Sequence, residues 1–403
     1  MIAERWYKKD VVLTWNARQS RFAVAQELFS SHDVDAGSRL LLRSLDLPSF
    51  PSEGHALDYG CGYGVLGLAF REQMPGWQVT LVDRDALAVG FSFWNADRPG
   101  MGDGSVRCRI GLGVDGGPAN GWDLILWNVP GKAGEVPLEF LTRDVSSSLA
   151  NDGLAALVVV NPLAGLIRET LASDDAVSII YDEQHAEHTV IHAKREGAGH
   201  DPGDPFDRGA FDREPVEFGV DSFDYTAVPV FGLPDYDEYG YSSQLVFDLL
   251  HTVEDAKSIV VMNPGQGHVP LVTANRLRPH RLLMVDRDQL ALRASVRLIA
   301  GSGPRVRRLE IAATPDLADL PPGAGWDLAI LMLEDQVRNE VQIARIADLS
   351  RLVPTGGAVI VAGGSTMVSR FLGFAAKAKG WKVRDRVKRG GAAAARVESV
   401  GPR

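Results

Sequence analysis

A glycine-rich turn at residues 58–64, Asp-Tyr-Gly-Cys-Gly-Tyr-Gly, carries the strongest chemical signal in the chain. An apolar run precedes it and a segment with helical spacing follows it, so the pattern predicts a strand, a tight turn and a helix. Glycine permits the left-handed backbone that such a turn needs and lets a ligand approach the main chain closely. Gly60, Gly62 and Gly64 are therefore predicted to line a nucleoside-binding loop.

Acidic residues near the turn narrow the choice of ligand. Asp83 ends the next predicted strand, where an acid typically binds ribose hydroxyls, and Arg84 follows it in the predicted site. Asp58 opens the turn itself. Its carboxylate would repel a pyrophosphate but suits a ligand that carries an ammonium and a sulfonium group. Asp58 therefore favours a positively charged nucleoside over a dinucleotide.

Asn128, Val129 and Pro130 follow another apolar run, where their polar groups could bind and orient a nucleophilic amine. Transfer from a sulfonium to an amine is an in-line displacement, in which holding the two reacting atoms in contact supplies much of the catalysis. The side-chain carbonyl of Asn128 and a backbone carbonyl near Val129 could accept the hydrogens of the amine. Asn128 and Pro130 are thus the candidate catalytic residues. In a second interpretation, Asn128 only caps the turn.

The elements that must position these residues alternate between strand-like and helix-like segments. This alternation predicts an α/β fold, in which a mostly parallel sheet is covered by helices on both faces. Such sheets bind ligands at the carboxyl ends of their strands. Asp58, Asp83 and Asn128 all fall at predicted strand ends, so we expect them to lie at one edge of the sheet.

The same plan occurs twice in the chain. VDRDALAV at 82–89 recurs as VDRDQLAL at 285–292, and WDLILWN at 122–128 recurs as WDLAILM at 326–332. The spacing between the two motifs is nearly equal in both halves, which indicates a duplicated domain. We predict two tandem Rossmann-like domains with an acidic Gly/Pro-rich linker between them; the boundaries are 1–195, 196–225 and 226–403.

The second copy keeps the plan but has lost much of the signature. Asn263 is interpreted as the replacement of the acid that opens the turn, and Val269 as the replacement of the third glycine. Asp286 remains at the end of the next strand, whereas the stretch from Met332 to Glu334 lacks the Asn-Pro pair. We expect a degenerate domain that supports the fold and helps to bind substrate. The alternative is that it still binds a nucleoside through Asp286.

The first half resembles the class I S-adenosylmethionine-dependent methyltransferases, whose first motif is an acid followed by G-x-G-x-G. Within that class it is similar to the ribosomal RNA guanine-N2 methyltransferases built on the "methyltransferase small" domain. That family has a phenylalanine followed by D-x-G-S/T before the glycine loop, and Phe29, Asp35, Gly37 and Ser38 match this pattern. The resemblance covers roughly residues 20–196.

This resemblance implies a function. S-adenosylmethionine would be the cofactor, held by Asp58, the three glycines, Asp83, Arg84 and Asn128. The reaction would be N-methylation of a guanine exocyclic amine, and the partner would be ribosomal RNA or the small ribosomal subunit. Many members of the family are tandem duplications with one degenerate half.

The sequence also departs from the family pattern. The family has Asn-Pro-Pro and then an aromatic residue, where this chain has Asn-Val-Pro-Gly, so the aromatic that would stack on a flipped base is missing. Gly113 occupies the place of an acid that contacts adenine, with Asp115 nearby as a substitute. Two alternatives follow: a methyltransferase with a small-molecule substrate, in natural-product tailoring or resistance, and a non-catalytic S-adenosylmethionine-binding protein.

Composition limits the remaining possibilities. The 403-residue chain has a formal net charge of −10, which argues against broad nucleic-acid binding but leaves room for one docking patch. The two cysteines do not suggest a disulfide framework, and no apolar run is long enough for a membrane span. A cytoplasmic location is expected. His185, His188 and His192 lack the Cys or acid that would complete a metal site, so no metal is expected.

Overall fold

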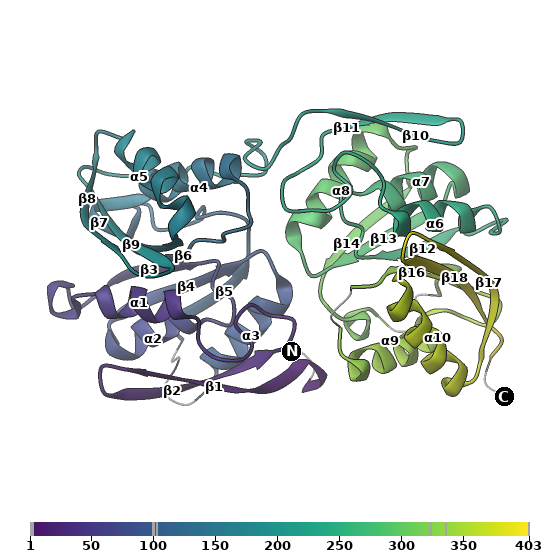
Figure 1. Cartoon of the computed structure of the whole chain (residues 1–403), viewed down its shortest axis with the longest axis horizontal. Coiled ribbons are helices and arrows are strands. Elements are labelled where there is room, and N and C mark those ends of the chain that lie inside the picture. Colours follow the sequence, from purple (N-terminus) through teal and green to yellow (C-terminus); the bar gives the residue numbers. More distant parts are fainter. Residues whose placement is uncertain (1–3, 99–100, 102–103, 322–324, 335–336, 402–403) are drawn as a thin grey trace. The chain divides into compact units, whose positions relative to one another are not determined.

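The computed structural model describes residues 4–98, 101, 104–321, 325–334 and 337–401 and divides the chain into two compact units, Met1–Phe211 and Asp212–Arg403. Each unit contains a two-stranded hairpin and a seven-stranded sheet with helices on both faces (Figure 1). The predicted α/β class with two Rossmann-like domains is therefore confirmed.

In unit 1 the hairpin precedes a sheet with the strand order β5-β4-β3-β6-β7-β9-β8. Strands β3 to β7 pair in parallel, while β9 runs antiparallel to both β7 and β8. The strands are β1 (Tyr7–Trp15), β2 (Arg18–Ala25), β3 (Gly54–Tyr59), β4 (Trp77–Asp83), β5 (Val106–Ile110), β6 (Trp122–Asn128), β7 (Leu149–Val160), β8 (Val177–Gln184) and β9 (His188–Arg195).

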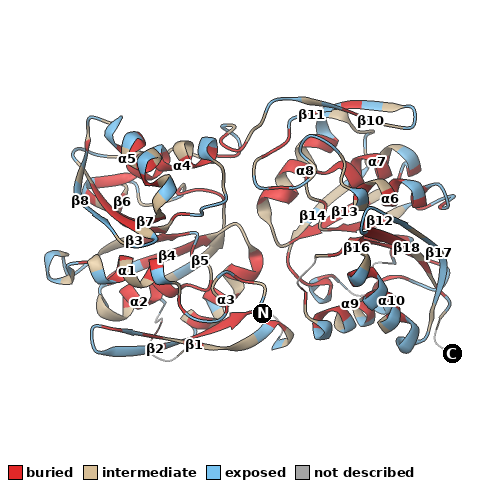
Figure 2. Cartoon of the chain, in the orientation of Figure 1, coloured by how far each residue is buried: buried red, intermediate tan, exposed pale blue. Residues whose placement is uncertain are grey.

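Five helices cover this sheet, with α1, α2 and α3 on one face and α4 and α5 on the other (Figure 1). They are α1 (Ala36–Ser44), α2 (Val65–Gln73), α3 (Ala86–Ala96), α4 (Glu135–Ser147) and α5 (Ala164–Ala172). Because both faces of the central strands are covered, most residues of these strands are apolar and buried (Figure 2).

Unit 2 repeats this topology, with the strand order β14-β13-β12-β15-β16-β18-β17. Its strands are β10 (Val216–Val220), β11 (Phe223–Ala227), β12 (Ser258–Met262), β13 (Arg281–Asp286), β14 (Arg308–Ala313), β15 (Leu328–Met332), β16 (Ala358–Gly364), β17 (Trp381–Arg389) and β18 (Ala392–Ser399). Its helices are α6 (Tyr241–Leu250), α7 (His268–Leu277), α8 (Gln289–Ser302), α9 (Asn339–Leu352) and α10 (Ser365–Ala378).

Two apolar layers hold unit 2 together, one on each face of its sheet. Helices α6, α7 and α8 pack on one face and α9 and α10 on the other. Alternate residues of β12 belong to opposite layers, as Val261 and Val260 illustrate. Among the described residues, no helix combines the length and apolar character that crossing a membrane requires.

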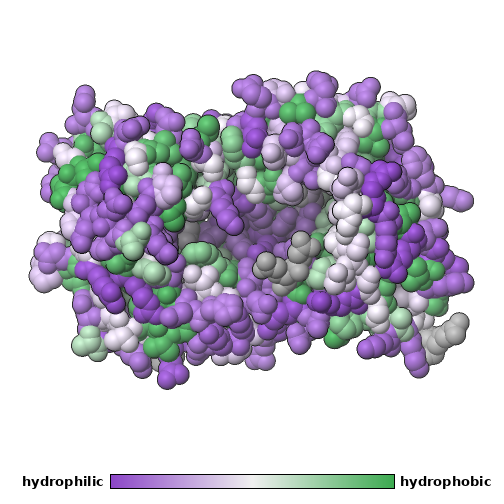
Figure 3. Space-filling model, viewed as in Figure 1, coloured by the Kyte–Doolittle hydropathy of each residue, from purple (hydrophilic) through white to green (hydrophobic). Residues whose placement is uncertain are grey.

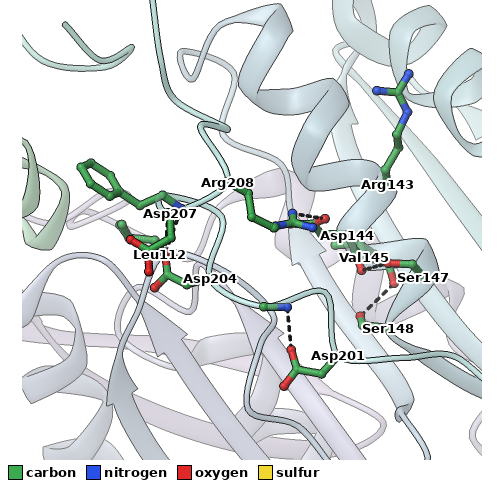
Figure 4. A network of polar contacts seen from close by, with 12 residues as sticks. Leu112, Arg143, Asp144, Val145, Ser147, Ser148, Asp201, Asp204, Asp207 and Arg208 are labelled. Atoms are coloured by element: carbon green, nitrogen blue, oxygen red, sulfur yellow. Dashed lines mark hydrogen bonds and ion pairs between the residues drawn. The ribbon is translucent and has the colours of Figure 1, made fainter. Parts of the chain in front are cut away.

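The expected linker, 196–225, is divided between the two units. Up to Phe211 it folds back on unit 1 rather than forming an open connector. Arg208 donates to both carboxylate oxygens of Asp144 on α4 at 2.6 Å, and Asp201 accepts from the backbone N–H of Gly116 at 3.0 Å (Figure 4). Phe206 and Phe211 are buried. Beyond Phe211 the chain enters unit 2 and forms the β10–β11 hairpin.

Candidate active site

The glycine-rich turn connects β3 to α2 at the carboxyl edge of the unit 1 sheet. Gly60, Gly62 and Gly64 all have left-handed backbone, with φ of 69°, 57° and 86°. The backbone N–H of Gly60 donates to the carbonyl of Val82 on β4 at 2.8 Å, which fixes the turn to the sheet. A Cβ at Gly60 or Gly62 would meet no atom within 4 Å. The loop thus leaves open space where a ligand can approach the main chain.

Asp58 lies beneath this loop as a buried acid. Its side chain is 1% exposed, and Oδ2 accepts from the backbone N–H of Gly67 at 2.7 Å. Gly67 has no room for a side chain, because a Cβ there would lie 2.4 Å from the Leu81 side chain. Oδ1 of Asp58 is buried without a hydrogen-bond partner. A buried carboxylate oxygen in this state fits a cationic group of a ligand.

Electrostatics at Asp58 oppose its ionisation in the free protein. Burial, together with the nearby negative charge of Asp83, raises the pKa of Asp58 to about 7, although the hydrogen bond from Gly67 acts in the opposite direction. A bound ammonium group would restore the charged form. A positively charged ligand is therefore expected to lower the pKa of Asp58.

Asp83 lies at the end of β4, next to the glycine loop. Its Oδ2 accepts from the backbone N–H of Gly62 and its Oδ1 from that of Asp85, both at 2.9 Å. These bonds fix the orientation of the carboxylate beside the glycine loop. Arg84 follows in the same half-buried stretch. The glycine loop and Asp83 are therefore joined by direct hydrogen bonding.

Asn128, at the end of β6, lies against the start of α1. Its Nδ2 donates to Asp35 Oδ2 at 2.9 Å and to Ser38 Oγ at 3.1 Å. Asp35 caps α1 by accepting from the backbone N–H of Ser38 at 3.1 Å. A Cβ at Gly37 would lie 2.9 Å from the Asp35 carboxylate. The residues of the predicted D-x-G-S pattern thus fix the amide of Asn128, and its carbonyl oxygen is the atom that can accept from a substrate.

The two residues after Asn128 differ in their surroundings. Val129 is buried, and its backbone N–H donates to the carbonyl of Val158 on β7 at 2.9 Å, so it extends the parallel ladder. Pro130 is exposed at the start of the loop that leads to α4. A proline at position 129 would remove this hydrogen bond.

Asp115 lies in the loop after β5, together with Gly113. Its carboxylate lies 3.9 Å from the guanidinium of Arg109. Gly113 lies against Pro205, whose Cδ would be 2.6 Å from an added Cβ. The folded-back segment up to Phe211 therefore fills the space that an acidic side chain at position 113 would need.

Two residues of the site were missed at the sequence level. Tyr63, inside the glycine loop, is 4% exposed, and its hydroxyl is buried without a hydrogen-bond partner. Burial, followed by the charge of Asp35, raises the pKa of Tyr63. Asn95 of α3 is wholly buried and joins the carbonyl of Tyr63 to both backbone groups of Ala23 on β2. An asparagine inside an apolar helix was the available signal for the second residue.

Cysteine and histidine side chains have structural surroundings. Cys61 is buried with Sγ 3.3 Å from Ser92 Oγ, and burial raises the pKa of its thiol. His192 Nε2 lies 2.8 Å from Ser44 Oγ, and burial lowers the pKa of this histidine to about 4. Among the residues that the structure describes, no cluster of three or more His, Cys, Asp or Glu could hold a metal ion.

The unit 2 loop corrects two residue assignments. Asn263 donates its backbone N–H to the carbonyl of Val285 at 2.8 Å, as Gly60 does to Val82, so Asn263 occupies the place of the first glycine. Its φ of 58° is one that asparagine tolerates. The interpretation of Asn263 as the replaced acid is wrong, because the strand register puts Val261 at the acid's place. Unit 2 therefore has no acid at the position that corresponds to Asp58.

The third glycine of unit 2 is present. Gly267 has φ of 100° and precedes α7, as Gly64 precedes α2. Val269 lies inside α7, so the interpretation that it replaces this glycine is also wrong. The loop of unit 2 keeps its backbone shape although its ligand-binding acid is gone.

The chain itself covers the unit 2 loop. Gln266 accepts from the backbone N–H of Val230 and donates to its carbonyl, both at 3.0 Å. His268 Nε2 lies 2.8 Å from the carbonyl oxygen of Asp235. Gln266 and His268 are both buried. The segment 230–235 therefore binds side chains at positions that are occupied in unit 1 by the buried Tyr63 and Val65.

The equivalent of Asp83 in unit 2 is also enclosed. Asp286 is 7% exposed, and burial raises its pKa to about 8, although a hydrogen bond from the backbone N–H of Asp288 opposes this shift. A neutral, enclosed carboxyl is a poorer acceptor for ribose hydroxyls than an ionised one.

The apo protein provides a first test of Asp58. Because its pKa in the fold lies above the unfolded value of 3.8, stability is lost as pH rises from about 4 to about 7 and the buried group ionises. Asp58→Asn cannot ionise and keeps an oxygen for Gly67. We expect this variant to melt at a higher temperature than the wild type near pH 8, and by a smaller margin near pH 5. Its affinity for the cationic ligand should fall.

Thermal unfolding followed by circular dichroism at both pH values measures the effect. Asp175→Asn, which changes an exposed acid of the same unit, is the control and should show no such pH-dependent gain. Equal melting of Asp58→Asn and the wild type near pH 8 would contradict the assigned state of Asp58.

Comparisons with known proteins agree with this geometry. A model of the methyltransferase small domain matches residues 19–169. "Ribosomal RNA small subunit methyltransferase C" of Pseudomonas entomophila is 45% identical over 104 residues, covering 26% of this chain and 29% of the relative. The protein of the same name from Pseudomonas syringae is 35% identical over 139 residues, covering 33% and 40%. The chain thus matches less than half of the length of these relatives.

A solved structure extends the likeness of fold to the whole chain. The 16S rRNA N2 G1207 methyltransferase of T. thermophilus, in complex with AdoMet and guanosine, has a TM-score of 0.71, with 14% identity, and covers 99% of this chain and 100% of that protein. At this identity the likeness concerns the fold. Residues 19–169 of this chain thus match the methyltransferase small domain, and the geometry of the site agrees with this match.

Proposed function

We propose that this protein is an S-adenosylmethionine-dependent N-methyltransferase that modifies a guanine exocyclic amine of small-subunit ribosomal RNA, with its active site in unit 1. The observation that carries the proposal is the orphaned Oδ1 of buried Asp58 beneath an open glycine loop. Asp83 and Asn128 complete the site at the ends of neighbouring strands.

The residues of unit 1 suit the parts of the cofactor. Asp58 would pair with the ammonium group of the methionine part, and Asp83 would accept from the ribose hydroxyls. The backbone of Gly60 and Gly62 leaves room for close approach. When bound, the sulfonium supplies the methyl group. Asp115 would contact the adenine amino group in place of the acid that the family has where this chain has Gly113.

Asn128 would act on the methyl acceptor. With Nδ2 engaged by Asp35 and Ser38, the side-chain carbonyl can accept a hydrogen of an exocyclic amine and hold the nitrogen lone pair in line. Pro130 would shape the loop beside it. Asp35 and Ser38 are positioning residues, because they act through Asn128.

The choice of substrate follows the relatives. Those named above are methyltransferases of the small ribosomal subunit RNA, and the T. thermophilus protein carries guanosine. The small-molecule alternative has no counterpart among these comparisons. We also propose that unit 2 binds no cofactor, since Val261 replaces the acid and Gln266 ties the loop to its own chain.

Methyl transfer to RNA tests the proposal directly. Purified protein, labelled S-adenosylmethionine and transcribed 16S ribosomal RNA are incubated, and the RNA is digested to nucleosides. We expect label in N2-methylguanosine. Label in another nucleoside would overturn the assignment of guanine, and cofactor binding without transfer to RNA would overturn the proposed activity.

Phe29 is the candidate to replace the missing aromatic. It is 73% exposed, in the segment that leads from β2 to the Asp35 cap beside Asn128. Stacking on a base contributes about 1–3 kcal/mol. We therefore expect Phe29→Ala to raise the KM for RNA roughly tenfold without weakening cofactor binding. Phe93→Ala, at a 59% exposed phenylalanine of α3, is the control. An unchanged KM for Phe29→Ala would exclude this role.

A further inference from the structure

Unit 2 has a strongly basic edge in an otherwise acidic chain. Residues 377–389 contain seven Lys and Arg residues and one acid, whereas the whole chain has a net charge of −10. We call this surface the β17 basic edge; its residues are Lys377, Lys379, Lys382, Arg384, Arg386, Lys388 and Arg389, and all of them are exposed. Strongly hydrophilic side chains cover the part of unit 2 where β17 runs (Figure 3).

Little of this positive charge is neutralised locally. Arg384 pairs with Glu398 at 2.6 Å, and the single acid, Asp385, pairs with Arg396 of β18 at 2.9 Å. Arg386 and Arg389 donate to neutral groups, Ser369 Oγ and Gln244 Oε1. Among the described residues, Lys377 and Lys388 have no ion-pair partner, whereas Lys382 lies opposite Glu398 of β18 and its charge contributes to lowering the pKa of that acid.

The charges are spread along the length of the strand and over both of its faces, because the register shift between Val383 and Asp385 puts Lys382 on the face opposite to Arg386 and Lys388. β17 is the outer strand of its sheet, so it is open along one side. Residues two apart on a strand are separated by about 6.6 Å, which places Arg386 and Lys388 in sequence along the edge. Cations spread along a strand suit a polyanion whose charges repeat along a chain.

Protection of the sheet edge explains only part of this charge. Lysine on an outer strand prevents pairing with other chains. Lys377 and Lys379, however, lie at the end of α10 and just after it, where no strand edge needs protection. The opposite edge of the same sheet also carries exposed cations, Arg305, Arg307 and Arg308, but there Glu310 of β14 pairs with Arg281 at 2.7 Å and with Arg308 at 3.0 Å.

We propose that the β17 basic edge binds the phosphate backbone of the RNA substrate, so that unit 2 holds the RNA while unit 1 carries the reaction. The inference rests on the proposed function for the identity of the polyanion. Phosphate contacts position a nucleic acid without reading its sequence. A local basic surface reconciles RNA binding with the acidic balance of the whole chain.

The test is a charge-reversal variant with a matched control. Lys382→Glu/Lys388→Glu changes the β17 basic edge, and Arg305→Glu/Arg307→Glu makes the same charge change at exposed positions before β14. Binding of the full-length proteins to a fluorescent 16S ribosomal RNA fragment is measured by anisotropy at several salt concentrations. Thermal unfolding and S-adenosylmethionine affinity serve as folding controls.

We expect the Lys382→Glu/Lys388→Glu variant to weaken RNA binding at least about tenfold and to reduce the slope of log K against log salt by about 0.7 for each lost contact with single-stranded RNA. Its KM for RNA should rise, with kcat at saturating RNA and cofactor affinity unchanged. If both variants bind RNA equally weakly, the loss of affinity follows from net charge alone and the inference is overturned. It is also overturned if the Lys382→Glu/Lys388→Glu variant binds RNA as tightly as the wild type.

Other outcomes separate this inference from the proposed function. If the wild type methylates RNA and the Lys382→Glu/Lys388→Glu variant does so with the same KM, only the inference fails. If the wild type binds RNA through this edge but methylates none, only the proposed activity fails. Edge-dependent binding to phosphatidylglycerol vesicles in preference to RNA would overturn the inference, as would a wild type that binds no RNA.

Discussion

Asp83→Ala is expected to abolish measurable binding of S-adenosylmethionine, whereas Asp286→Ala should bind one equivalent per chain like the wild type. The Asp83 carboxylate is held by the backbone N–H groups of Gly62 and Asp85, so its removal deletes the ribose acceptors and also loosens the glycine loop. Each hydrogen bond to a charged group contributes about 1.5–3 kcal/mol. Two such bonds correspond to a loss of affinity on the order of 100-fold or more.

Isothermal titration calorimetry measures both the affinity and the stoichiometry. Asp83→Asn, which keeps one acceptor oxygen, should give an intermediate affinity and guards against a misfolded alanine variant. Loss of binding in Asp286→Ala, or two equivalents bound by the wild type, would place cofactor in unit 2 and contradict the proposed division of labour.

Asn128→Ala is expected to lower kcat on RNA by about 100-fold or more, with a much smaller change in cofactor affinity. The amide is fixed by Asp35 and Ser38 at 2.9 and 3.1 Å, so its carbonyl is held in place before the substrate arrives. Loss of one such preorganised polar group typically costs 10²–10³ in kcat, about 2.7–4 kcal/mol. Single-turnover kinetics with saturating RNA isolate the chemical step.

The positioning role of Asp35 can be tested in the same assay. Asp35→Asn should lower kcat while leaving the KM for RNA nearly unchanged, because only the orientation of Asn128 is altered. Asn151→Ala, at an exposed asparagine of β7, should behave as the wild type. A kcat for Asn128→Ala equal to that of the wild type would leave Asn128 with the role of a turn cap.

The parts of the site that lie within one strand–turn–helix segment could be predicted from the sequence. The glycine loop and the acid after the next strand have fixed spacing because consecutive parallel strands end at the same edge of the sheet. The contact between Asn128 and Asp35 spans 93 positions, and no spacing rule specifies it. The resemblance named both ends of this contact, but only the structure joins them.

The predictions that proved wrong concern positions where the residue type alone does not indicate the backbone conformation. Asn263, as the first residue of the predicted loop, was expected at the place of the acid, yet its left-handed φ of 58° is that of the glycine it replaces. The segment 196–225 looks like a solvated connector by composition. Composition does not reveal that Phe206 and Phe211 are buried or that Arg208 forms an ion pair with Asp144. These contacts attach the first half of the segment to unit 1.

The covered loop of unit 2 has a thermodynamic consequence. Segment 230–235 is an internal ligand for that unit, present at all times and independent of the concentration of any metabolite. Under the proposed function, unit 1 would instead gain further stability from bound cofactor, roughly in proportion to the logarithm of the free cofactor concentration. The resistance of unit 1 to unfolding would then depend on the cofactor concentration, whereas that of unit 2 would not.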